Sequence, residues 1–238
     1  MPSHEYSAAW YSTFLETIPA EQTASEVAFI SRLIPLASHS TILDVCCGPG
    51  RHANQLARAG YHVVGIDNNA AAIARAREGA PESATYREGD MRRLDALGDR
   101  FDGVINLWAS FGYFDDATNE AVLRQIAGVL HEGGRALIDV YNRDHMLCLP
   151  SSDTAQRGGL EVLTERAWSG NRFRVRLQYS SGVRDEFEWR LYTPHEMSDV
   201  CAAAGLDTVL ACAWFNESLP ASADHARMQL VLERRDPQ

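Results

Sequence analysis

Apolar and polar residues follow two different rhythms along this chain of 238 residues. From residue 41 to residue 142, short apolar runs alternate with segments in which apolar residues recur every three or four positions. This pattern predicts strands alternating with helices. The expected strands are 41–46, 62–66, 84–88, 101–107 and 135–141, and the expected helices are 52–59, 69–78 and 116–130. Such alternation is typical of a parallel sheet with helices on both faces.

After residue 142 the apolar residues recur at every second position, which predicts antiparallel strands at 160–168, 172–180 and 183–192. We interpret these strands as an insertion that lies over the mouth of a site as a lid. An extension of the sheet edge or a dimer contact is the alternative. The α/β pattern then returns with a helix at 195–204, and strands at 207–215 and 227–232 form a closing antiparallel hairpin.

Two helices with apolar faces, 5–18 and 21–34, precede the first strand. Together the elements predict an α/β fold: a doubly wound, seven-stranded, mostly parallel, Rossmann-like sheet with an inserted antiparallel β lid. The expected segments are N-terminal helices covering the site (1–40), a cofactor-binding core (41–142), the lid (143–193) and the completion of the core (194–238).

A glycine loop follows the first strand and carries the most specific chemical pattern. The strand contains Asp44, the loop contains Gly48, Pro49 and Gly50, and the next strand ends in Asp67, seventeen residues beyond Gly50. Glycines let the backbone approach a ligand, and the start of the following helix offers free N–H groups to an anion. Asp67 can accept hydrogen bonds from both hydroxyls of a ribose. The pattern therefore predicts an adenosine-containing cofactor.

Two cofactors compete for this site. Residues 48–53 match the G-x-G-x-x-G/A fingerprint of nicotinamide dinucleotide enzymes. Three acidic or turn features favour S-adenosylmethionine instead: Asp44 within the first strand, Asp90-Met91 after the third strand, and the sharp turn at 130–134. The terminal hairpin adds to this preference, because it does not fit two mirrored mononucleotide halves.

Residues 41–142 resemble a class I S-adenosylmethionine-dependent methyltransferase, with every motif in order. Residues 44–50 resemble the family's Asp-x-Gly-x-Gly-x-Gly motif, Asp67 matches the ribose-binding acid, and Asp90-Met91 matches the adenine site. The tail from residue 190 is similar to that of small-molecule members with a lid, such as the sugar N-methyltransferases. Cys46 replaces the first glycine of the motif, and a cysteine fits there if its φ is negative.

The resemblance and the residue types together predict the members of the site. Tyr113 is expected to line the acceptor pocket, and His145, just beyond the fifth strand, is the candidate general base. His52 could touch the carboxylate of the cofactor, and Tyr11 could close over it. The expected cofactor-binding residues are Tyr11, Asp44, Cys46, Gly48, Pro49, Gly50, His52, Asp67, Asn68, Asp90, Met91, Leu107 and Trp108.

Net charge and cysteine content indicate which substrates, metals and cellular location to expect. The formal net charge of −10 disfavours a nucleic-acid substrate, so we expect a small-molecule acceptor. Five cysteines without a C-x-x-C pair predict reduced thiols, no metal site and a cytoplasmic location. The N-terminus lacks the pattern of a signal peptide, and no apolar run is long enough to span a membrane. A homodimer could form through the lid strands.

The predicted function is the transfer of a methyl group from S-adenosylmethionine to nitrogen or oxygen of a small molecule. Alignment of the reacting groups can supply most of the acceleration in such a reaction, so a catalytic diad is not required. Two alternatives stay open from the sequence: a protein that binds S-adenosylmethionine without transferase activity, and a nicotinamide-dependent oxidoreductase.

Overall fold

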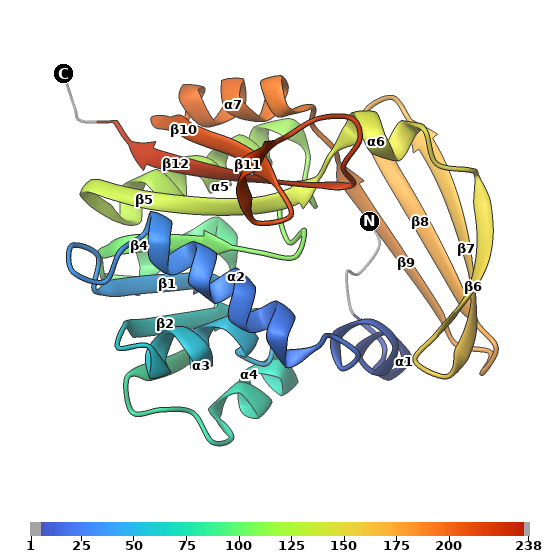
Figure 1. Ribbon diagram of the computed structural model, residues 1–238, viewed down its shortest axis with the longest axis horizontal. Coiled ribbons are helices and arrows are strands. Elements are labelled where there is room, and N and C mark those ends of the chain that lie inside the picture. Colours follow the sequence, from blue (N-terminus) through green and yellow to red (C-terminus); the bar gives the residue numbers. More distant parts are fainter. Residues whose placement is uncertain (1–5, 236–238) are drawn as a thin grey trace.

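The main body of the protein is a single twisted sheet of eight strands (Figure 1). A computed structural model describes residues 6–235, so the outer ends of the expected first and last segments lie outside the described residues. The strand order is β11-β10-β12-β5-β4-β1-β2-β3. The strands are β1 (Thr41–Val45), β2 (His62–Asp67), β3 (Ala84–Glu88), β4 (Phe101–Asn106), β5 (Leu130–Tyr141), β10 (Leu206–Ala213), β11 (Asn216–Pro220) and β12 (Arg227–Arg234).

The five strands from β3 to β5 are parallel, whereas β12 is antiparallel to both of its neighbours. This arrangement confirms the predicted doubly wound fold with a closing hairpin. It adds one strand, because β11 pairs with the end of β10 beside a register shift at Cys212/Ala213. The sequence of β11, Asn-Glu-Ser-Leu-Pro, has no apolar alternation and therefore carried no strand signal.

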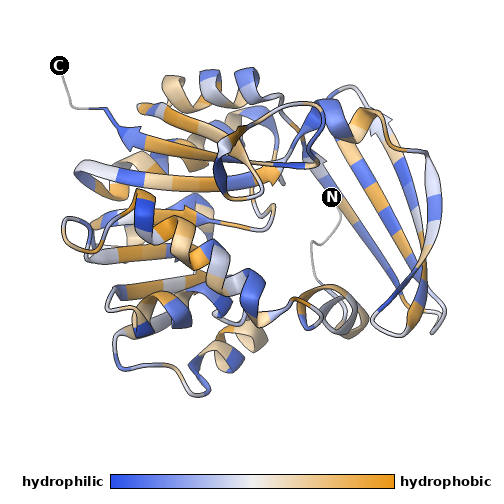
Figure 2. Cartoon of the chain, viewed as in Figure 1, coloured by the Kyte–Doolittle hydropathy of each residue, from blue (hydrophilic) through white to orange (hydrophobic). Residues whose placement is uncertain are grey.

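Helices cover both faces of the main sheet, and each face has its own apolar cluster. One cluster contains residues of α2, α3 and α4, and the other contains residues of α5 and α7. Figure 2 shows the apolar strands of the main sheet between these helices. The helices are α2 (Ala20–Leu33), α3 (Arg51–Arg58), α4 (Ala70–Arg77), α5 (Asp116–Val129), α6 (Arg143–Leu147) and α7 (Pro194–Ala203), with a 3₁₀ segment, η2, at Met91–Leu97.

A second, antiparallel sheet stands beside the main one and is called the lid below (Figure 1). Its order is β6-β7-β8-β9, one strand more than expected. The added strand, β6, is polar (Ser-Asp-Thr-Ala-Gln-Arg) and so lacks the period-two signal. The strands are β6 (Ser152–Arg157), β7 (Leu160–Ser169), β8 (Arg172–Tyr179) and β9 (Arg184–Arg190).

The two faces of the lid differ in chemistry. One face is buried and apolar, and the other carries cross-strand ion pairs such as Arg174–Glu188 and Arg176–Glu186. The N-terminal segment packs against the apolar face through Tyr6. The expected helix 5–18 is in fact one α-helical turn, α1 (Ala8–Trp10), followed by a π-helical turn, η1 (Tyr11–Leu15). In the described part of the chain, no helix is long and apolar enough to cross a membrane.

Candidate functional site

The glycine loop that follows β1 contains three residues with left-handed backbone. They are Cys46 (φ 61°), Gly48 (φ 53°) and Gly50 (φ 78°). The condition of a negative φ at Cys46 is not met, because the chain turns back immediately after β1. This conformation costs a residue with a side chain roughly 1–2 kcal/mol. Hydrogen bonds from Cys47 N to Ile66 O (2.9 Å) and from Gly50 N to Cys47 O (3.0 Å) hold the turn.

Gly50 packs closely against Tyr86 of β3. It is not among the residues that line the cavity beside the loop. A Cβ atom at Gly50 would lie 2.5 Å from the hydroxyl oxygen of Tyr86, which donates a hydrogen bond of 2.8 Å to Asn54. At Gly50 the loop therefore comes close to the tyrosine on β3, and the cofactor contact at this glycine stays a prediction.

Two acidic side chains on neighbouring strand ends face one cavity of about 730 Å³. Asp67 ends β2, and its two carboxylate oxygens accept hydrogen bonds from the N–H groups of Gly48 (2.9 Å) and Asn69 (2.9 Å). Asp90 caps η2 and accepts hydrogen bonds from Arg92. The cavity volume lies within the range of small-molecule sites. The structure thus brings Asp67 and Asp90 to the same side of the sheet.

Two buried polar atoms at the end of the cavity near β1 lack hydrogen-bond partners among the described residues. One is an Oδ2 oxygen of Asp44, a side chain that is 3% exposed, and the other is Nη2 of Arg51. Burial raises the pKa of Asp44 to about 8. Buried polar groups are normally paired, so these two indicate a ligand with complementary groups. An ammonium group would suit Asp44, and a carboxylate would suit Arg51.

His52 lines the cavity but is not available to a carboxylate. Its Nε2 donates a hydrogen bond of 2.7 Å to Glu26 of α2, which also pairs with Arg51 at 2.8 Å. Burial lowers the pKa of His52 to about 4, so the ring is neutral. Burial opposes ionisation of Glu26, but the hydrogen bond from His52 and the charge of Arg51 outweigh it and lower the pKa to about 2. Arg51, not His52, is the cationic side chain at this end.

Trp108 follows β4 and is held in an unusual conformation. Its φ is 61°, and its backbone N–H donates a hydrogen bond of 2.8 Å to the buried carboxylate of Asp139. The indole lies between two guanidinium groups, those of Arg51 (4.7 Å) and Arg227 (4.5 Å). Strained backbone of this kind clusters at functional sites. Its contact with the Trp108 ring fixes the position of Arg51 at the cavity.

Aromatic side chains form another part of the cavity wall; Tyr6, Trp10 and Tyr113 belong to this aromatic wall. The hydroxyl oxygens of Tyr6 and Tyr113 lie 2.5 Å apart. Burial raises the pKa of both phenols, so they are neutral. Tyr11 lies closer to the acidic end, where burial and then the charge of Asp67 raise its pKa.

Of the residues predicted to bind the cofactor, all but Gly50 line this cavity. The predicted base, His145, is not brought to it. His145 lies on α6, and its Nδ1 is 2.9 Å from the carbonyl oxygen of Ala223 in the loop before β12. The sequence did not reveal Glu26, which lies 26 residues before its partner His52 and belongs to no local motif. It also did not point to Arg51, because attention fell on the neighbouring His52.

Within residues 6–235, no group of three or more His, Cys, Asp or Glu side chains is arranged to hold a metal ion.

Comparison with known proteins gives the geometry a family context. Residues 42–134 match the family model described as a methyltransferase domain. The chain is 27% identical over 175 residues to a dTDP-3-amino-3,4,6-trideoxy-α-D-glucopyranose N,N-dimethyltransferase from Streptomyces venezuelae, covering 69% of this chain and 73% of that protein.

Solved structures share the fold. An S-adenosylmethionine-dependent methyltransferase from Clostridium acetobutylicum superposes with a TM-score of 0.80 at 13% identity, covering 96% of this chain and 98% of that one. CalS10, an amino pentose methyltransferase from Micromonospora echinaspora with S-adenosylmethionine bound, has a TM-score of 0.69 at 21% identity, covering 97% and 99%. Residues 42–134 thus match a methyltransferase domain, and solved methyltransferases share the fold of the chain.

Proposed function

We propose that this chain is a class I methyltransferase that transfers the methyl group of S-adenosylmethionine to a nitrogen or oxygen of a small-molecule acceptor. The observation that carries the proposal is one cavity whose wall contains three kinds of groups. Asp67 and Asp90 face it from strand ends, Asp44 and Arg51 offer unpaired polar atoms, and aromatic side chains close it. The acids at the strand ends suit an adenosine, the unpaired polar atoms suit an amino-acid group, and the aromatic side chains suit the reacting centre.

The amino-acid end of the cofactor fits the two open positions. Asp44 would hold the ammonium group and Arg51 the carboxylate, while Asp67 would accept hydrogen bonds from the ribose hydroxyls. Asp90 and Met91 would face the adenine. When bound, S-adenosylmethionine supplies a methyl group on a positively charged sulfur. The residues of this chain then have to align an acceptor with that methyl group and exclude water, which is the main contribution of orientation to such a reaction.

An amine nitrogen is the acceptor that the wall supports best. Apart from the acids assigned to the cofactor and the neutral His52, the described lining residues include no carboxylate or histidine. A hydroxyl acceptor needs a base, whereas a neutral amine already has a free electron pair. The similarity to a sugar N,N-dimethyltransferase favours an amino sugar as the first acceptor class to test.

A cytoplasmic location is part of the proposal, because all five cysteines are free thiols. That nucleic acid is not a substrate, and that a homodimer forms, both stay predictions from the sequence.

The test is methyl transfer from tritium-labelled S-adenosylmethionine to a panel of nucleotide-linked amino sugars and simple amines. Transfer to an amine, lost in Asp67→Ala, supports the proposal. The alternatives have their own outcomes. Cofactor binding without transfer to any acceptor or to a cell extract would favour a binding protein. Calorimetric binding of a nicotinamide dinucleotide but not of S-adenosylmethionine would overturn the proposal.

A further inference from the structure

Tyr6 and Tyr113, the two tyrosines of the aromatic wall, come from segments that are far apart in the sequence. Tyr6 precedes α1 and Tyr113 lies in the segment after β4, yet their hydroxyl oxygens are 2.5 Å apart. Neither segment has regular hydrogen bonding of its own at that point. Contacts from elsewhere must therefore set the position of the pair, and the lid supplies them on both sides.

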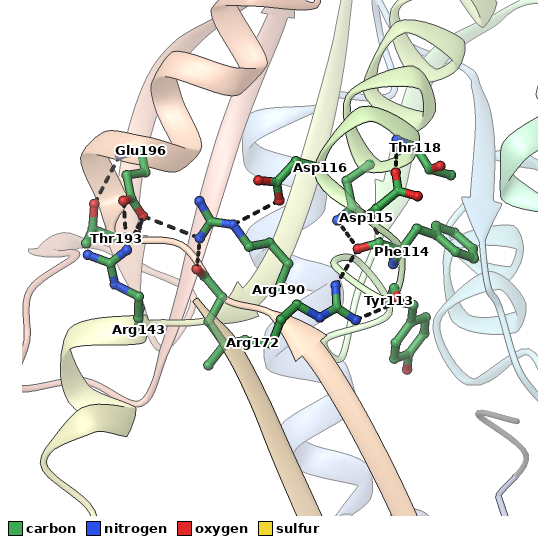
Figure 3. Close-up of polar contacts among 12 residues, drawn as sticks. Tyr113, Phe114, Asp115, Asp116, Thr118, Arg143, Arg172, Arg190, Thr193 and Glu196 are labelled. Atoms are coloured by element: carbon green, nitrogen blue, oxygen red, sulfur yellow. Dashed lines mark hydrogen bonds and ion pairs between the residues drawn. The ribbon is translucent and has the colours of Figure 1, made fainter. Parts of the chain in front are cut away.

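Arg172 at the start of β8 holds the Tyr113 side of the pair. Its guanidinium donates hydrogen bonds to the carbonyl oxygens of Phe114 and Tyr113, the latter at 3.2 Å, as Figure 3 shows. The same guanidinium is oriented by Glu188 of β9 at 3.0 Å. Arg172 is only 23% exposed, so this is a fixed contact between the lid and the main body rather than a solvated ion pair.

Asp185 on β9 holds the Tyr6 side. Its carboxylate accepts hydrogen bonds from the backbone N–H (3.2 Å) and hydroxyl (2.8 Å) of Ser7, the residue next to Tyr6. The hydroxyl of Tyr179 donates a third hydrogen bond at 2.8 Å. Asp185 is 7% exposed, and these partners of the buried carboxylate belong to the lid and to the N-terminal segment.

Two further residues of β9, on the same face of the strand as Asp185, also contact the tyrosine pair. Phe187 packs on Tyr6 with ring centroids 4.9 Å apart, and Trp189 packs on Tyr113 at 6.0 Å. Trp189 also donates a hydrogen bond of 3.1 Å to the carbonyl oxygen of Ala109. Phe187 and Trp189 do not themselves line the cavity. The lid therefore lies behind the two tyrosines and supports them, instead of forming the wall directly.

We infer that Arg172 and Asp185 of the lid are positioning residues that set the Tyr6–Tyr113 pair against the reacting centre of the cofactor. The inference rests on the proposed function. Neutral aromatic rings attract a cation such as the sulfonium of S-adenosylmethionine, but not the neutral sulfur of S-adenosylhomocysteine. A correctly placed pair therefore favours the methylated cofactor over its product, and loss of either support should weaken that preference.

The experiment measures dissociation constants of S-adenosylmethionine and S-adenosylhomocysteine by calorimetry and compares their ratio between variants. Tyr6→Ala, which removes one ring of the pair, sets the reference. It should shift the ratio against S-adenosylmethionine by roughly threefold to tenfold, the scale of a cation–aromatic contact. Arg172→Ala and Asp185→Asn should shift the ratio in the same direction. Hydrogen exchange of residues 108–114 should be faster in Arg172→Ala.

Two exposed lid residues provide matched controls. Arg174→Ala removes an arginine from the same strand that also pairs with Glu188 but has no contact with residues 113–114, and Glu186→Gln changes an acid next to Asp185. Both should keep the wild-type ratio. If Arg172→Ala does not fold, Arg172→Lys replaces it, because a lysine can reach one of the two carbonyls and should give an intermediate ratio.

Two results would overturn the inference: an unchanged ratio in Arg172→Ala (or in its Arg172→Lys replacement) and Asp185→Asn, which includes an equal loss of affinity for both ligands, or an unchanged ratio in Tyr6→Ala. Failure of the wild-type protein to bind either ligand would instead refute the proposed function, so the two failures are distinguishable.

Discussion

Asp44 combines full burial with a carboxylate oxygen that has no partner in the described structure. Burial raises its pKa to about 8, so the free protein keeps a proton on this group at neutral pH. An ammonium ligand favours the ionised form. We expect cofactor binding at pH 7 to release a proton, and affinity to rise as the pH approaches about 8. Calorimetry in two buffers of different ionisation enthalpy counts the proton, and Asp44→Asn should abolish the release.

The same group affects stability with a definite sign. In the unfolded chain Asp44 titrates near 3.8, while in the folded protein it titrates near 8. Between these values the unfolded state binds fewer protons, so the contribution of Asp44 to the free energy of unfolding falls as the pH rises. Urea unfolding at several pH values should therefore show a shallower decline for Asp44→Asn than for the wild type. Parallel declines would mean that Asp44 is ionised in the folded protein.

Asp67 is the residue whose loss should most directly weaken cofactor binding. Asp67→Ala removes the proposed ribose contact and the acceptor for Gly48 N–H, and it should cost about 1.5–3 kcal/mol of binding free energy, the scale of hydrogen bonds to a charged group. Calorimetry with S-adenosylhomocysteine measures it. Asp99→Ala, which breaks an exposed pair with Arg87, is the control and should leave affinity unchanged. Equal affinities for Asp67→Ala and wild type would leave Asp67 as a loop-holding residue only.

At the residue scale, the sequence located the residues that a local motif carries and missed those that act through tertiary contacts. Asp44 lies near the end of β1, Asp67 ends β2 and Asp90 follows β3, at the sheet edge where parallel sheets gather ligand-binding groups. The position of Arg51 depends on its ion pair with Glu26 of α2. The two residues are far apart in the sequence, so no local motif predicts this pair. His145 was chosen for its nearness to a strand end, but α6 carries it away from the cavity.

At the scale of elements, the close approach of β9 to the segment after β4 should be sensitive to a single methyl group. Gly112 has φ 100°, and a Cβ atom there would lie 2.5 Å from the backbone oxygen of Arg190, whose N–H donates a hydrogen bond of 2.7 Å to Gly112 O. Gly112→Ala should lower the free energy of unfolding by more than the roughly 1–2 kcal/mol expected from the strained conformation alone.

Gly98→Ala gives the comparison, because Gly98 also has a positive φ (73°) but nothing lies within 4 Å of the added atom. Urea unfolding measures both variants. Equal destabilisation would show that the lid moves aside at Arg190 without cost, and that the contact is not fixed in solution.

Elements were predictable where apolar periodicity was strong. The parallel strands and their helices follow from it, as do the three apolar lid strands. β6 and β11 are polar edge strands whose formation depends on pairing with a neighbour, so no pattern within them reveals it. The π-helical turn at Tyr11–Leu15 likewise has the same apolar spacing as an α-helix, and the sequence could not distinguish them.

At the scale of the whole molecule, the lid and the main sheet form one continuous apolar cluster that includes Phe187, Trp189 and residues of α5 and α7. Polar contacts reinforce the junction: Arg190 of β9 pairs with Asp116 of α5 at 3.1 Å, and Arg143 of α6 pairs with Glu196 of α7 at 2.7 Å (Figure 3). The sequence predicted an inserted antiparallel sheet that covers the site as a lid. The structure confirms the separate antiparallel sheet and places it behind the tyrosine pair, and its role as a cover stays a prediction.

A ligand that fits the cavity should stabilise the whole molecule. S-adenosylhomocysteine at about 100 times its dissociation constant should add roughly 2.7 kcal/mol to the free energy of unfolding. Thermal unfolding with and without the ligand measures this, with adenosine alone as the control, since it lacks the amino-acid group for Asp44 and Arg51. A shift no larger with S-adenosylhomocysteine than with adenosine would argue against the role of that end of the cavity.

A crystal structure with S-adenosylhomocysteine bound tests the assignment of the cavity most directly. The predicted result places the ribose hydroxyls within hydrogen-bonding distance of Asp67, the ammonium group at Asp44, the carboxylate at Arg51 and the sulfur toward the two tyrosines. A ligand bound elsewhere, or bound here with its sulfur turned away from Tyr6 and Tyr113, would contradict it.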